Sequence, residues 1–240
     1  MFPRRFDIGS TLMREATRWI VDKALIKRAE WMVEASGLVE ELRPLREKKK
    51  AEQGEGLSVL CLGAGKGHEM DEIDTRLPET TVVGVDPHDH WAPPVKKRLE
   101  RLGHKASYLH ESFHAGDLKE IGGASQDVIT LFFVLHHVEG KDLDKIFSEI
   151  DRVLIKGEAG RIFVAEDIVD NDEERRITTD ADRRINLEIR NGPHDYKSTE
   201  EWREFFLARG FAVKRVNEIK PDKVKHGFFI LERVKETKPE

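Results

Sequence analysis

The chain has 240 residues, a net charge of −5, 38% hydrophobic residues and a single cysteine, Cys61. This length suits one compact α/β domain with an extension; the acidic balance argues against nucleic acid as a partner, and the lone cysteine excludes an internal disulfide or a multi-cysteine zinc site. Because we find neither an apolar run near the roughly 20 residues of a membrane-spanning helix nor a signal peptide, we expect no membrane association and a cytoplasmic location.

The first 54 residues predict a helical extension. Residues 10–36 place apolar side chains on one helical face, and Gly37 is expected to interrupt that helix. Residues 38–52 are rich in charge and predict a solvated helix. We therefore divide the chain into an N-terminal helical extension, 1–54, and a main domain, 55–240.

From residue 55 onward, strand and helix signals alternate. Short apolar runs predict strands at 57–62, 80–85, 105–109, 128–133 and 161–165. Amphipathic stretches predict helices at 68–77, 93–102 and 141–154. The run 128–133 is apolar on both faces, as is typical of a central parallel strand.

The C-terminal third departs from this alternation. Residues 168–197 are polar and predict a helical insertion, and a capping-box pattern at 198–201 begins the next helix. The apolar runs 211–219 and 226–234 are joined by so short a connection that they must pair antiparallel. The expected fold class is α/β: a Rossmann-like, doubly wound, mostly parallel sheet with an antiparallel C-terminal hairpin.

A glycine-rich turn follows the first predicted strand directly, in the sequence Gly63-Ala64-Gly65-Lys66-Gly67. Glycines allow a sharp turn and a close approach of ligand to backbone, although such a turn alone also marks ordinary strand-to-helix connections. The next strand ends in Asp86, whose carboxylate is suited to the two hydroxyls of a ribose. Strand, turn, amphipathic helix and Asp86 together predict a nucleoside-cofactor site.

The spacing of the glycines bears on which cofactor binds. Dinucleotide sites use Gly-x-Gly-x-x-Gly, in which the third glycine lets helix and strand pack closely. This chain has His68 at that position and a glycine one residue earlier, at Gly67. The turn therefore departs from the nicotinamide pattern.

These residues resemble the class I S-adenosylmethionine-dependent methyltransferases over about residues 55–235. The glycine turn is similar to that family's first motif, Gly84-Val85-Asp86-Pro87 to its second, and residues 127–138 to the fourth-strand motif of its small-molecule branch. The resemblance implies S-adenosylmethionine as cofactor, with Asp86 on the ribose and Glu111 on the adenine amino group. The implied cofactor-binding residues are Cys61, Gly63, Ala64, Gly65, Gly67, Asp86, Pro87, Glu111, Ser112, Phe132 and Phe133.

The chain departs from the family pattern in two places. Cys61 stands where the family usually has an acid, a position that bears on how the methionine end of the cofactor is oriented. Residues 156–160 replace the usual Pro-Gly-Gly before the fifth strand, which we interpret as a variant turn.

Methyl transfer from a sulfonium is an in-line displacement, so the protein mainly has to align acceptor and methyl group. A base is needed only if the acceptor must lose a proton. The candidate catalytic residues follow the predicted strands or precede the capping box; they are His136, His137 and Tyr196, with Glu166, Asp167 and His194 as further candidates. Each also has a structural interpretation, as a helix cap, a solvent-facing strand end or an ordinary loop residue.

A metal-binding interpretation arises at His88-Asp89-His90, where potential ligands alternate. This segment directly follows the ribose acid, where adenine contacts are expected, so we expect no metal there or elsewhere. The paired arginines between 175 and 184 alternate with acids, which favours a solvated helix with internal ion pairs over a clamp for an anionic acceptor.

We therefore predict an S-adenosylmethionine-dependent methyltransferase with a small-molecule acceptor, covered by the insertion at 168–197. The alternatives are an NAD(P)-binding oxidoreductase, a nucleic-acid methyltransferase and a catalytically silent cofactor-binding protein. Residues 133–136 lack the Asn/Asp-Pro-Pro-aromatic motif of amino-methylating nucleic-acid enzymes. The acceptor, the methylated atom and the oligomeric state stay open.

Overall fold

The computed structural model describes residues 26–87, 106–110, 118–157, 159–186 and 194–234. Its strands are β1 (Ser58–Leu62), β2 (Thr81–Asp86), β3 (Ala106–His110), β4 (Val128–Phe132), β5 (Arg161–Ile168), β6 (Phe211–Ile219) and β7 (Lys225–Arg233). Its helices are α2 (Leu38–Gln53), α3 (His68–Arg76), α5 (Gly140–Val153), α6 (Asp172–Asn186) and α7 (Thr199–Leu207), and β4 is followed by a 3-10 turn, η3 (Leu135–His137). The helix predicted at 93–102 lies outside the described residues.

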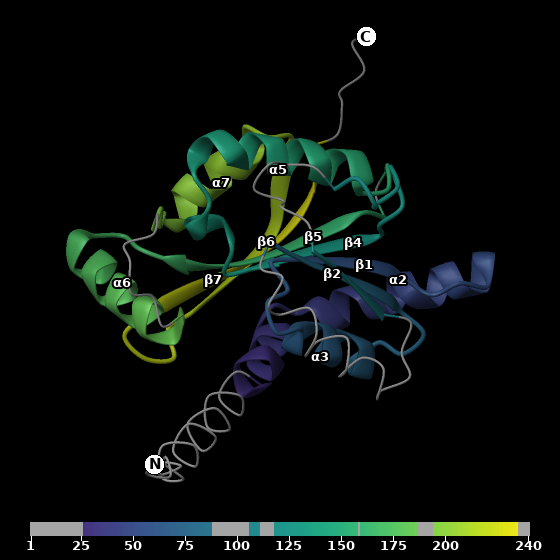
Figure 1. Cartoon of the computed structure of the whole chain (residues 1–240), viewed down its shortest axis with the longest axis horizontal. Coiled ribbons are helices and arrows are strands. Elements are labelled where there is room, and N and C mark those ends of the chain that lie inside the picture. The colour runs from purple at the N-terminus through teal and green to yellow at the C-terminus, as the bar shows by residue number, and fades with distance from the viewer. Residues whose placement is uncertain (1–25, 88–105, 111–117, 158, 187–193, 235–240) are drawn as a thin grey trace, which may run out of the picture.

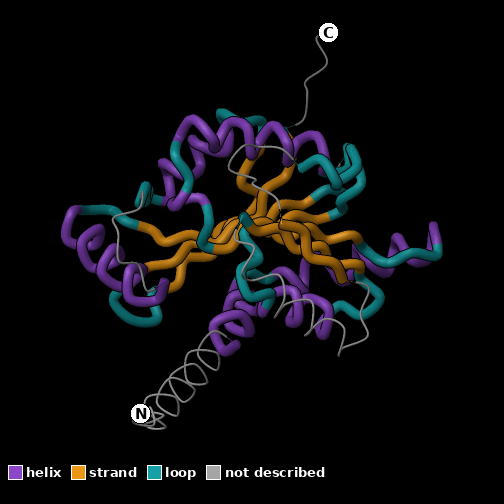
Figure 2. Tube along the Cα trace, in the orientation of Figure 1, coloured by secondary structure: helices purple, strands orange, loops and turns teal. Residues whose placement is uncertain are grey.

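The seven strands form one sheet in the order β3-β2-β1-β4-β5-β7-β6. Neighbours from β3 to β5 pair in parallel, whereas β7 pairs antiparallel with both β5 and β6. Helices α5 and α7 cover one face of the sheet, and α2 and α3 cover the other (Figures 1 and 2). The predicted doubly wound sheet with an antiparallel C-terminal pair is confirmed.

This strand order contains one reversal of direction. The chain runs from β1 outward to β2 and β3 and then returns to β4 on the other side of β1. In open α/β sheets such a reversal leaves a crevice at the carboxyl ends of the two central strands. The predicted cofactor turn follows β1, and the predicted catalytic histidines follow β4.

Burial follows the apolar pattern of the central strands. All five residues of β4 and all eight of β5 are buried, as a parallel strand covered on both faces requires. Helix α5 turns one apolar stripe to the sheet, comprising Leu143, Ile146, Phe147, Ile150 and Val153. The capping box at Ser198 is present, with the side chains of Ser198 and Glu201 bonding reciprocally to each other's backbone N–H.

Two expectations need correction. Strand β5 continues to Ile168 because Glu166 and Asp167 keep pairing with β7, so these acids lie within the strand and not after it. Helix α2, expected to be solvated, buries Leu38, Val39 and Leu42 against the core, and its other residues are exposed or half-buried. Among the described residues, no helix has the length and apolar character needed to cross a membrane.

Candidate functional site

The glycine turn between β1 and α3 has a left-handed backbone at Gly63, Gly65 and Gly67, with φ values of 73°, 48° and 71°. A Cβ added to Gly63 would lie 2.4 Å from Cγ2 of Val134, so this glycine is required by packing against the end of β4. Among the described residues, a Cβ added to Gly65 would meet nothing closer than the Gly63 carbonyl oxygen at 4.0 Å. Packing within the described part of the chain therefore restricts Gly63 more than Gly65.

Asp86 holds this turn against the end of β2. The backbone N–H of Gly65 donates a hydrogen bond of 2.8 Å to Oδ2 of Asp86, and the N–H groups of Gly63 and Ala64 both donate to the Val85 carbonyl. The Asp86 residue is only 5% exposed. The predicted ribose acid thus lies directly beside the predicted cofactor turn.

The other predicted cofactor residues differ in burial, and two of them lie outside the described residues. Ala64 and Phe132 are buried, Phe133 and Pro87 are half-buried, and Phe133 has a left-handed backbone with a φ of 58°. Glu111 and Ser112, like the segment 88–91 considered for metal, lie outside the described residues. Cys61 is completely buried in β1.

Glu69 is a buried acid that the sequence interpretation missed. It lies in the first turn of α3, and its Oε1 accepts a hydrogen bond of 3.2 Å from the Thr130 hydroxyl. The Cys61 thiol is a second partner of the same carboxyl group, and burial raises the pKa of Glu69 to about 7. Helix α3 therefore supplies a carboxyl group next to the position where the family usually has its acid and this chain has Cys61.

The raised pKa of Glu69 predicts that the stability of the fold depends on pH. Its pKa is raised in the folded state, so between its unfolded pKa and about 7 the unfolded chain binds fewer protons, and stability falls as pH rises. We expect the free energy of unfolding of Glu69→Gln, measured by urea denaturation, to exceed that of the native chain at pH 8 by up to about 3 kcal/mol. The two should match near pH 5. Glu72→Gln, on the same helix and more exposed, is the control and should show no such divergence. Parallel stability profiles for Glu69→Gln and the native chain would refute this assignment.

A histidine–carboxylate pair lies at the carboxyl ends of β4 and β5. Nδ1 of His136 lies 2.5 Å from Oε2 of Glu166, and both side chains are completely buried. The other oxygen of Glu166 accepts backbone hydrogen bonds from Val134 at 3.0 Å and Leu135 at 2.6 Å. Burial opposes a charge on His136, but Glu166 and Asp182 outweigh it and raise the pKa of His136 to about 10.

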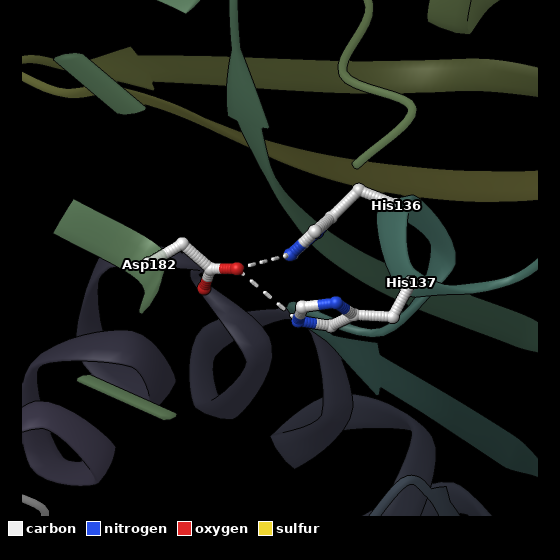
Figure 3. Close-up of side chains that lie close together, drawn as sticks. All are labelled: His136, His137 and Asp182. Carbon is white, nitrogen blue, oxygen red and sulfur yellow. Dashed lines mark ion pairs between the residues drawn. The ribbon is translucent and has the colours of Figure 1, made fainter. Parts of the chain in front are cut away.

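Helix α6 adds a carboxylate to this pair. Oδ2 of Asp182 lies 3.6 Å from Nε2 of His136 and 3.5 Å from Nε2 of His137 (Figure 3). Nδ1 of His194 lies 3.3 Å from the same oxygen, and 3.3 Å from the Tyr196 hydroxyl. We call these five residues, with Glu166, the histidine cluster.

Exposure separates the three predicted catalytic residues. His136 is 0% and Tyr196 1% exposed, whereas the His137 side chain is 26% exposed. Burial, together with the charge of His136, lowers the pKa of His137 to about 4 and leaves its ring neutral at pH 7. Of the three, only His137 therefore has part of its side chain exposed.

Asp182 is the second residue that sequence interpretation missed. The expected pattern of a solvated helix does hold for part of α6, since Arg176 forms an ion pair with Glu173 at 2.7 Å and lies 3.8 Å from Asp180. Asp182, however, is only 4% exposed. One turn of a charged helix thus faces inward.

Aromatic side chains from three segments meet beside this cluster. The ring of His226 packs edge-on against Trp31 at 5.3 Å and Phe133 at 5.4 Å between centroids, and its Nδ1 lies 2.6 Å from Oδ1 of Asp167. The Arg28 guanidinium stacks 4.4 Å from the centre of the Phe133 ring. The N-terminal helical segment therefore contributes side chains beside the end of β4, a role the sequence pattern did not indicate for Trp31.

Residues 59–157 match a family model described as a methyltransferase domain. Over these residues the chain is similar to methyltransferase domains. The match begins in β1, includes the glycine turn and the histidines after β4, and ends beyond α5. The predicted relationship to S-adenosylmethionine-dependent methyltransferases is confirmed.

Solved structures show the same fold as this methyltransferase domain. Mitomycin 7-O-methyltransferase is 16% identical with a TM-score of 0.61, over 85% of this chain and 54% of its own. The Burkholderia thailandensis 1,6-didemethyltoxoflavin-N1-methyltransferase is 15% identical with a TM-score of 0.60, over 98% of this chain and 92% of its own. Its structure contains 1,6-didemethyltoxoflavin and S-adenosylhomocysteine. An O-methyltransferase from neocarzinostatin biosynthesis is 19% identical with a TM-score of 0.55, over 74% of this chain and 49% of its own. Its structure is a complex with S-adenosylmethionine and 2-hydroxy-5-methyl naphthoic acid.

This chain spans about half the length of the first and third of these proteins. At such low identities the similarity concerns the fold. No curated protein sequence matches the chain.

Proposed function

We propose that this protein transfers the methyl group of S-adenosylmethionine to a small-molecule acceptor. The observation that carries the proposal is the glycine turn tied to Asp86, which lies beside the histidine cluster. The two parts are neighbours because Val134, which packs on Gly63, lies two residues before His136. A cofactor on the turn would therefore present its methyl group next to the cluster.

The cofactor supplies the activated methyl group when bound. The part of this chain's own residues would be to hold the acceptor in line with that methyl group. An oxygen or nitrogen acceptor also loses a proton, and the histidine cluster is the polar group beside which that loss would take place. We assign His137 to the acceptor side of the cluster because it is partly exposed, and His136 and Tyr196 to positioning roles.

A small planar acceptor fits the surroundings of this site. Trp31, Phe133 and His226 offer ring edges and faces next to the end of β4. The net charge of −5 argues against nucleic acid as the acceptor. Structures of similar fold in complex with 1,6-didemethyltoxoflavin or 2-hydroxy-5-methyl naphthoic acid support the same class.

We also propose that two segments cover the acceptor pocket: the described part of the N-terminal extension, 26–54, and that of the insertion, 168–186 and 194–197. Arg28 and Trp31 come from the first, and Asp182 and His194 come from the second. Residues 55–240 would then form the cofactor-binding domain.

The experiment that tests the function is methyl transfer from isotopically labelled S-adenosylmethionine. Hydroxylated and amino-substituted aromatic acids, transfer RNA and duplex DNA are offered separately, with Asp86→Ala as the inactive control. We expect label in at least one aromatic product and none in nucleic acid. Label only in nucleic acid, or equal label with the control variant, would reject the proposal.

A further inference from the structure

We propose that His136, His137 and Asp182 bind one divalent transition-metal cation. The three side chains come from η3 and α6 and turn their polar atoms toward one another (Figure 3). One ligand atom from each lies within 4.8 Å of the other two. Among the described residues this is the one group of three histidine, cysteine or acidic side chains that meets this criterion.

The distances fit coordination better than hydrogen bonding. Oδ2 of Asp182 lies 3.6 Å and 3.5 Å from the Nε2 atoms of His136 and His137, beyond the range of about 2.7–3.2 Å that N–H···O bonds prefer. Ligand atoms about 2.1 Å from a tetrahedral metal are separated from one another by about 3.4 Å. A cation that displaces the Nε2 proton of His136 would therefore fit between the three atoms, which all lie within 4.8 Å of one another.

Glu166 provides a second, independent observation. It holds Nδ1 of His136, which directs Nε2 toward Asp182, and is itself fixed by two backbone N–H groups. Metal-binding histidines usually have their second ring nitrogen held by a carboxylate in this way. Nε2 of His136 is completely buried and makes no hydrogen bond with any described residue, an arrangement that a cation would satisfy.

The donor set defines the class of cation. Two imidazoles and one carboxylate suit Zn²⁺, Fe²⁺ or Mn²⁺ and leave coordination positions for other ligands. If the proposed function holds, an acceptor hydroxyl could occupy one of them, and the cation would lower the pKa of that hydroxyl before methyl transfer. Metal binding itself does not depend on that function.

Cobalt(II) is the probe, because its visible absorption reports coordination geometry. The full chain is freed of metal with a chelator and titrated with Co²⁺. We expect an absorption band that saturates at one equivalent and disappears when Zn²⁺ is added. His137→Ala and Asp182→Asn should each weaken binding by more than about tenfold.

Asp180→Asn is the matched control, since Asp180 lies on the same helix but outside the cluster. It should bind Co²⁺ like the native chain. His137 is partly exposed, so its substitution keeps the test valid if Asp182→Asn fails to fold, as judged by circular dichroism. Absence of the band, or an unchanged band in a folded ligand variant, would overturn the proposal. Binding of S-adenosylhomocysteine by the same metal-free protein tests the proposed function separately.

Discussion

Asp86→Ala is expected to weaken binding of S-adenosylhomocysteine by at least about 100-fold, measured by isothermal titration calorimetry. The proposed role of Asp86 is to accept hydrogen bonds from both ribose hydroxyls, and bonds to a charged group contribute about 1.5–3 kcal/mol each. The substitution also removes the acceptor for the Gly65 N–H, which helps to hold the glycine turn.

Asp86→Asn separates these two effects. The asparagine oxygen can still accept from Gly65, so the turn should keep its shape while the charge on the ribose side is lost. We expect a loss of affinity intermediate between the native chain and Asp86→Ala. Native affinity in Asp86→Ala would show that this carboxylate does not bind the cofactor.

Glu166→Ala is expected to lower the free energy of unfolding by about 3–5 kcal/mol, measured by urea denaturation at pH 7. Removing this carboxylate leaves His136 buried without its partner and leaves the N–H groups of Val134 and Leu135 without their acceptor. Each unsatisfied buried group adds to the cost.

Two further variants check the explanation. Glu166→Gln keeps an oxygen for the backbone N–H groups and loses only the acceptor for Nδ1 of His136, so its loss of stability should be smaller than that of Glu166→Ala. Glu139→Ala removes an exposed acid near the same turn and should change stability by less than about 0.5 kcal/mol. Stability of Glu166→Ala equal to that of Glu139→Ala would contradict the buried network.

Most of the sheet was predictable because its signals are local. The apolar runs of β1, β2 and β4 report burial on both faces, and the glycine turn follows β1 without a gap. Strand β5 was predicted too short because its last residues, Glu166 and Asp167, are polar. Pairing with β7 extends the strand, and that partner is distant in the sequence.

The histidine cluster was only partly predictable. His136, His137, Glu166 and His194 were recognised by their places after or near strands, but no local pattern distinguishes Asp182 from the solvated acids around it. Its burial depends on how α6 packs against the end of β4, which is a tertiary property. Glu69 was missed for a related reason, because an acid in the first turn of a helix is common without any buried role.

The most direct test of the central claim is calorimetric titration of the native chain with S-adenosylhomocysteine, with NAD and NADP in parallel. The glycine spacing with His68 in place of a third glycine, and the turn held by Asp86, predict micromolar binding of S-adenosylhomocysteine and none of either dinucleotide. Selective binding of a dinucleotide, or no binding of S-adenosylhomocysteine, would contradict the claim that this protein uses S-adenosylmethionine.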